Sequence, residues 1–140
     1  MKTINDYIGN WPLETEECRK EKRHIHIPPE KALTVIHGKE QETKVTFFIS
    51  NSRSHVGKLE LCQGRHSDPE IHKGDEILMV LKGKLQIVIL SELKDENAVS
   101  RKAYEVGESE RFLIPEGYKH QYFNLGQGMT EVLFTIAPGL

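Results

Sequence analysis

The stretch GRHSDPEIHKGDEILMVLKG, from Gly64 to Gly83, places polar side chains that bind metals or protons directly before a strongly apolar strand. A partner stretch lies downstream, from Gly107 to Asn124, and reads GESERFLIPEGYKHQYFN. In this second stretch a short apolar run ends in a Pro-Glu-Gly turn, and the next strand opens on a histidine. Each stretch therefore predicts a β-strand with potential metal ligands at or just before its first residues.

The two stretches resemble the paired sequence motifs of the cupin superfamily. The first motif of that family has a glycine, a His-x-His pair, a glutamate and a glycine, and its spacings fit Gly64, Glu70, His72, Glu76 and Gly83. Glu70 stands where the family usually has its first histidine, which changes the charge of any metal shell. In the second motif the positions in register are Pro115, Gly117, His120 and Asn124.

Length and composition indicate one domain whose partners are small molecules or proteins. A chain of 140 residues suits one domain that buries about two thirds of its unfolded surface. Its 19 basic and 21 acidic residues give a net charge of −2, so no overall field favours nucleic acid or an anionic membrane. Cys18 and Cys62 lack metal-type spacing and are interpreted as free thiols. With no stretch near roughly 18 apolar residues and no signal-peptide pattern, we expect a cytoplasmic protein.

We expect an N-terminal extension over residues 1–31, ahead of a cupin barrel domain over residues 32–140. The extension begins with one short helix, because Thr3 and Asp6 form a capping-box pattern. The alternation from His24 to Ile27, before two prolines, predicts an edge strand. If its isoleucines face the core, both of its histidines face solvent or an interface.

From residue 32 onward short apolar strands alternate with turns. The predicted strands are Leu33–His37, Thr43–Ile49, Val56–Cys62, Glu76–Leu81, Leu85–Leu90, Tyr104–Val106, Arg111–Ile114, His120–Asn124 and Glu131–Ala137. Residues 82–84 predict a hairpin between the fourth and fifth of these, whose near-continuous apolar character suggests burial on both faces. The charged segment Asp95–Lys102 is predicted to be a mobile loop. Turn signals roughly every 8–12 residues indicate an all-β sandwich or barrel. The resemblance implies the cupin jelly roll, or double-stranded β-helix.

The resemblance also assigns four side chains to one divalent transition metal, namely Glu70, His72, Glu76 and His120. Two imidazoles and two carboxylates suit Fe, Mn, Zn, Ni or Co, and no organic cofactor is predicted. Two alternatives stay open, a cupin that has lost its metal and a pair of histidines buried against ordinary hydrogen-bond partners. The second leaves Glu76 unexplained, because a buried carboxylate beside an apolar strand needs a cation or strong donors.

Three further residues are candidate catalytic groups beside an open coordination position: Tyr122, His66 and Glu60. Tyr122 shares its strand parity with His120, so it points inward as a general acid, a substrate contact or an ordinary wall residue. His66 lies in the loop of the first motif, either as a base at the pocket mouth or merely as a loop residue.

Two classes of function fit these residues. The first is a metal-dependent enzyme, such as an isomerase, epimerase, lyase or dioxygenase, that acts on a small sugar or organic acid in the barrel pocket. The second is a non-catalytic cupin that binds or senses a metabolite. Sensors usually carry a partner domain, which this sequence does not show, so the enzyme is favoured over both the sensor and a purely structural barrel. We also expect a homodimer, because a jelly roll leaves strand edges unpaired.

Overall fold

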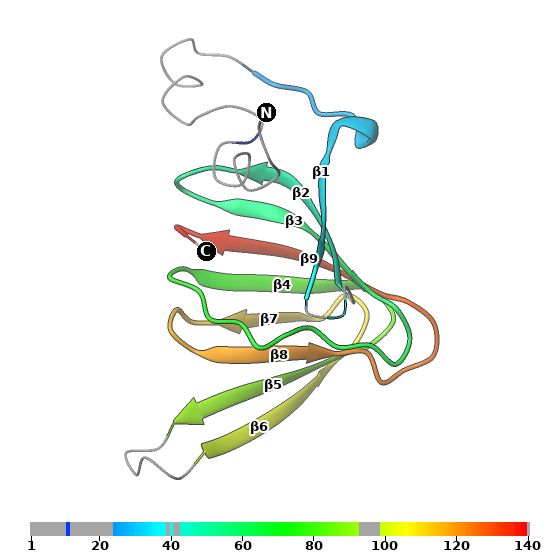
Figure 1. Cartoon of the computed structure of the whole chain (residues 1–140), viewed down its shortest axis with the longest axis vertical. Coiled ribbons are helices and arrows are strands. Elements are labelled where there is room, and N and C mark those ends of the chain that lie inside the picture. The colour runs from blue at the N-terminus through cyan, green and yellow to red at the C-terminus, as the bar shows by residue number, and fades with distance from the viewer. Residues whose placement is uncertain (1–10, 12–23, 39, 41–42, 93–98, 140) are drawn as a thin grey trace.

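The computed structural model of the chain describes residue 11 and residues 24–38, 40, 43–92 and 99–139 (Figure 1). Its regular elements in these residues are η1 (a 3-10 helix, Pro29–Lys31), β1 (Leu33–His37), β2 (Thr43–Ser50), β3 (His55–Leu61), β4 (Asp75–Lys82), β5 (Leu85–Glu92), β6 (Val99–Val106), β7 (Arg111–Ile114), β8 (Lys119–Phe123) and β9 (Thr130–Ala137). Across this described part, no helix has the length and apolar character that a membrane span requires.

The strands form two antiparallel sheets. The larger sheet has the order β1-β2-β3-β9-β4-β7, and the smaller has the order β6-β5-β8. Neighbours within a sheet come from distant parts of the chain, since β3 pairs with β9 and β5 pairs with β8. Figure 1 shows β2 and β3 toward one end of the molecule and β5 and β6 at the other. This all-β arrangement is a jelly-roll barrel, which confirms the predicted fold class.

The apolar core lies between the two sheets. Buried and intermediate residues alternate along β3 and β9, as expected for strands with one face toward a core. The fully buried apolar side chains include Leu61, Leu78, Val80, Leu85, Ile87 and Ile114. Burying one such side chain stabilises a fold by roughly 1.5–3 kcal/mol, so strands of both sheets contribute to holding the barrel together.

The predicted hairpin between β4 and β5 is wrong. β4 pairs with β7 and β9, whereas β5 pairs with β6 and β8, so the two strands lie in different sheets. The turn at Gly83, whose φ is 78°, instead carries the chain from one sheet to the other. Burial on both faces of β4 is also wrong, because its residues alternate and Ile77 is 55% exposed. Apolar content alone overestimates burial, because a sheet's open outer face also carries apolar side chains.

Three expectations concern the N-terminal extension and the charged loop. Residues 24–27 form no strand, so the edge strand predicted there is wrong. The helix predicted near Thr3 lies outside the described residues. β6 already begins at Val99, so the second half of the segment predicted as a loop, Asp95–Lys102, is strand, and its first half lies outside the described residues.

Candidate metal centre

The segment before β4 runs antiparallel along the edge of β8. Its backbone pairs Ser67 N with Tyr122 O at 2.8 Å, and Asn124 N donates to Arg65 O at 2.9 Å. Glu70 and His120 exchange two hydrogen bonds, Glu70 N to His120 O at 2.8 Å and His120 N to Glu70 O at 2.9 Å. Directly opposed residues of an antiparallel pair project to the same face of the sheet. The backbone therefore places the Glu70 side chain beside the His120 ring.

The turn into β4 positions His72 and Glu76. Gly74 is buried so closely against the chain that a Cβ there would lie 2.5 Å from the backbone of Ala137. The turn of the second motif closes over the first motif, because Gly117 N donates to His72 O at 3.0 Å. Residues 70, 72, 74 and 76 alternate with exposed neighbours, as the sequence predicts from strand parity. The two motifs are thus joined by backbone hydrogen bonds before any side chain is considered.

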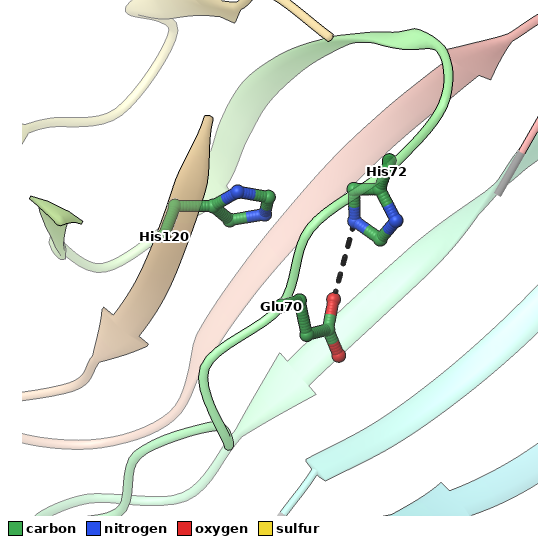
Figure 2. Close-up of side chains that lie close together, drawn as sticks. All are labelled: Glu70, His72 and His120. Carbon is green, nitrogen blue, oxygen red and sulfur yellow. Dashed lines mark ion pairs between the residues drawn. The ribbon is translucent and has the colours of Figure 1, made fainter. Parts of the chain in front are cut away.

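Four side chains converge at this junction. His72 Nε2 lies 3.3 Å from Glu70 Oε2 and 3.3 Å from Glu76 Oε2, and His120 Nε2 lies 3.2 Å from the same Glu76 oxygen. Figure 2 shows Glu70, His72 and His120, with His120 projecting from β8 and the other two from the facing segment. Donor atoms of Glu70, His72 and His120 all lie within 4.8 Å of one another. One ion could therefore contact them together.

The geometry of these atoms fits a metal better than it fits hydrogen bonding. His72 Nε2, His120 Nε2 and Glu76 Oε2 are buried and, in the described part of the chain, none has a hydrogen-bond partner despite the short separations. Buried polar atoms are rarely left in that state, because an unsatisfied donor or acceptor costs roughly 1–3 kcal/mol. A divalent cation between them would satisfy all three, and imidazole nitrogens with carboxylate oxygens are suitable ligands for it.

Neighbouring groups orient these ligands. His120 Nδ1 lies 3.0 Å from Tyr118 O, and a carbonyl accepts only, so Nδ1 carries the proton and Nε2 keeps its lone pair in the neutral ring. The Tyr122 hydroxyl donates to Glu76 Oε1 at 2.5 Å, so the carboxylate presents its other oxygen to the histidines. Such contacts to the groups around a metal fix ring and carboxylate orientation.

Without a metal, short contacts and charge together shift the pKa values of these groups. Burial by itself lowers the pKa of His72, but the adjacent carboxylates of Glu70 and Glu76 outweigh it and raise that pKa to about 9. Burial by itself raises the pKa of Glu76, but the two histidines and the Tyr122 hydroxyl lower it to about 2. The site thus holds a buried carboxylate in its ionised form, ready for a cation.

The three predicted catalytic residues lie in different surroundings. Tyr122 is buried at the site, and burial followed by the charge of Glu76 raises its pKa well above the usual range. His66 is exposed, bridges to Phe123 and places its Nδ1 3.0 Å from Ser67 O. Glu60 alternates with the inward-facing leucines of β3 and pairs with Lys58 at 3.2 Å. The structure therefore brings Tyr122 to the candidate metal ligands and leaves His66 and Glu60 outside the pocket.

A pocket of about 440 Å³ opens beside the ligands, and its wall includes a histidine that the sequence does not single out. His37, at the end of β1, lines this pocket with its Nδ1 3.6 Å from Glu70 Oε1. A second histidine, His55, is buried near the site, with its Nδ1 2.6 Å from Ser50 Oγ, and burial lowers its pKa. The parity of β1 is the only signal that could have found His37, since Val35 also faces the pocket.

The chain is similar in sequence and in fold to known proteins. No family model matches the chain. Oxalate oxidase 1 of Hordeum vulgare is 34% identical over 73 residues, which cover 51% of this chain and 35% of that protein, so the match spans about a third of the relative's length. A solved structure of oxalate oxidase superposes with a TM-score of 0.57 and 26% identity, over 69% of this chain and 51% of the other. The cupin domain of Cnp3 from Schizosaccharomyces pombe has a TM-score of 0.57 at 14% identity, over 68% of this chain and 60% of that one.

The fold and the convergent side chains define a jelly-roll protein with a candidate His/Glu metal site. Its paired motifs and the similarity to oxalate oxidase support a place for the chain in the cupin superfamily.

Proposed function

We propose that this cupin is a metal-dependent enzyme that acts on a small organic molecule in its barrel pocket. In this proposal Glu70, His72, Glu76 and His120 hold one divalent transition metal, of the group Fe, Mn, Zn, Ni and Co. The observation that carries the proposal is the meeting of three buried donor atoms, His72 Nε2, His120 Nε2 and Glu76 Oε2, that have no hydrogen-bond partner among the described residues.

The surrounding residues suit the handling of a bound molecule. When bound, the metal would supply Lewis acidity to an oxygen of the substrate. Tyr122 holds the Glu76 carboxylate in one orientation, and His37 lies at the edge of the pocket against Glu70. Apolar side chains line the pocket beside the proposed ligands, and such a low-dielectric wall strengthens electrostatic interactions. The similarity to oxalate oxidases supports an organic acid, among the sugars and acids that the sequence suggests, as one class to test.

Non-catalytic metabolite binding is the second candidate, and one observation favours it. The ionisable groups among the described lining residues are His37, Glu70, His72, Glu76 and Tyr122. Three of these are proposed ligands, and the hydroxyl of Tyr122 already donates to Glu76. A free acid or base beside the metal, expected of many metal-dependent enzymes, is thus restricted to His37 among these residues.

Metal analysis tests the proposal. We expect purified protein to carry about one equivalent of a divalent transition metal per chain, and His72→Ala to lose it. His66→Ala is the matched control, because His66 lies outside the pocket, and it should keep the metal. A folded wild type that binds none of the five metals at micromolar concentration would reject the metal-dependent function.

Two further proposals concern assembly and location. We propose a homodimer because β1 and β7 end the larger sheet and β6 ends the smaller one, so strand edges lack a neighbour within the described sheets. Light scattering that gives a monomer mass at micromolar concentration would reject it. We also propose a cytoplasmic location, which the free and exposed thiol of Cys62 supports.

A further inference from the structure

Much of the pocket wall is built from apolar side chains. Val35, Val45 and Leu59 stand opposite one another in register across β1, β2 and β3, and all three line the pocket. Such a row forms one continuous apolar strip, because directly paired residues lie side by side on one face. A ligand in this pocket must therefore place part of its own surface against hydrocarbon.

Two aromatic rings extend this strip. Phe47 and Phe134 pack edge to face with centroids 5.9 Å apart, and both line the pocket. Gly57 lies between them in register, and a Cβ there would come 3.0 Å from the Phe134 ring and 2.3 Å from Thr46 O. The absence of a side chain at this position makes room for both rings. The sequence thus keeps an aromatic surface within the barrel.

The polar part of the pocket wall has few groups that would attract an anion. Its charged groups include the carboxylates of Glu70 and Glu76, and among the described lining residues none is lysine or arginine. His37 contacts Glu70, so its ring already faces a carboxylate. Two carboxylates also cancel the charge of a divalent ion, which leaves little attraction for a dianion.

We infer that the pocket takes a ligand with an apolar, ring-sized body and an uncharged oxygen-bearing head, in preference to a small dicarboxylate. The head, a carbonyl or hydroxyl group, would meet the metal beside Glu70, His72 and Glu76. The body would lie against Phe47, Phe134 and the strip Val35–Val45–Leu59. A volume of about 440 Å³ falls within the range of pockets that enclose such molecules. The position of the head rests on the proposed metal centre.

A ligand series on the unmodified protein tests this inference by separating charge from apolar bulk. The probes are oxalate, pyruvate, phenylpyruvate and 1-phenylpropane-1,2-dione, which all carry oxygen atoms on two adjacent carbon atoms. Binding is measured by calorimetry on protein loaded with Zn(II). We expect the neutral aryl dione to bind at least tenfold more tightly than oxalate, and phenylpyruvate more tightly than pyruvate. Oxalate binding as tightly as the aryl dione, or no binding of either aryl compound, would overturn the inference.

Substitutions at two adjacent positions of β1 give a second, independent test of the apolar strip. Val35 lines the pocket, whereas Ile36 is 53% exposed on the other face of the same edge strand. Val35→Lys should raise the affinity for oxalate about tenfold and lower the affinity for the aryl dione about tenfold. Ile36→Lys should change neither affinity. Equal changes in affinity in Val35→Lys and Ile36→Lys would contradict the role of the apolar strip in ligand binding.

Metal content and ligand preference together distinguish a failure of the apolar pocket from a failure of the metal-dependent function. Protein that carries no metal but still binds the aryl dione tenfold better than oxalate would reject the metal-dependent function and support the apolar pocket. Protein that carries one metal but prefers oxalate would keep the metal centre and reject the apolar ligand.

Discussion

The Tyr122 hydroxyl donates to Glu76 Oε1 at 2.5 Å, and this bond leaves Glu76 Oε2 between the rings of His72 and His120. Tyr122 comes from β8 and Glu76 from β4, which belong to different sheets. One hydrogen bond thus links the two sheets at the point where the candidate ligands meet. Tyr122 acts as a positioning residue for the carboxylate.

Removing that hydroxyl should weaken metal binding. We expect Tyr122→Phe to lower metal affinity by roughly 10–100-fold, as measured by competition with a chelating dye, because the carboxylate loses the group that orients it. Tyr104→Phe is a matched control, since the Tyr104 ring packs on Phe112, a side chain outside the pocket lining. Equal metal affinity in Tyr122→Phe and wild type would show that the bond does not position the ligand.

The metal-free protein should lose stability at alkaline pH. The pKa of His72 is raised to about 9 from 6.5, so its stabilising contribution is complete below pH 6.5 and is lost as the pH rises through 9. Glu76, with its pKa lowered to about 2, contributes fully above pH 4.5 and loses its contribution only as the pH falls through 2. We expect the urea-derived free energy of unfolding to fall by roughly 1–3 kcal/mol from pH 6 to pH 10.

The His72→Ala variant provides the comparison for this pH series. Its unfolding free energy should change less over the same range, because the group that titrates is gone. A wild type that gains stability toward pH 10, or a variant with an unchanged slope, would contradict the assignment.

Glu70 offers a test of ligand identity. Glu70→His should keep the metal, because a donor replaces a donor, while the charge of the shell rises by one and anions bind more tightly. Glu70→Ala removes the donor and should lower metal affinity by at least tenfold at neutral pH. Full affinity in Glu70→Ala together with loss in His72→Ala would make Glu70 a pocket acid or base beside a three-ligand site.

Gly74 should be intolerant of a side chain. A Cβ at this position would lie 2.5 Å from the carbonyl carbon and oxygen of Ala137, and backbone atoms cannot move aside as a flexible side chain can. We expect Gly74→Ala to destabilise the protein by about 1–3 kcal/mol in urea unfolding. Gly126→Ala is the control, since its Cβ would meet Asn124 Oδ1 at an ordinary 3.7 Å. Equal stability of the two variants would contradict the close packing at Gly74.

The sequence predicts the strands and their faces better than it predicts their partners. The bounds of Leu33–His37 and Arg111–Ile114 are those of β1 and β7, because turn residues flank both runs. Parity places His72, Glu76, His120 and Tyr122 inward, as observed. The hairpin between β4 and β5 fails because a Lys-Gly-Lys turn is compatible with a tight hairpin and with a change of sheet. β4 pairs with β9, whose residues lie more than 40 positions further along the chain, and local periodicity does not describe such a pairing.

In the candidate site, too, the sequence predicts some residues and misses contacts that depend on how distant segments pack. The four proposed ligands come from two motifs, and it is the resemblance of these motifs to those of cupins, more than parity, that predicts their meeting. Glu60 was predictable as outward-facing, since it alternates with Leu59 and Leu61 on β3. The contact of His37 with Glu70 was not predictable, because it depends on how β1 lies over the segment before β4.

X-ray absorption on metal-loaded protein tests the four-ligand centre most directly. The expected spectrum shows a first shell of nitrogen and oxygen alone, with outer-shell scattering from two imidazole rings. His120→Ala should bind the metal more weakly, so it is loaded with metal in excess, and its scattering should then fall to that of one ring. In His66→Ala the scattering should stay at two rings. A spectrum with a sulfur ligand, or with two rings retained in His120→Ala, would contradict a centre built from Glu70, His72, Glu76 and His120.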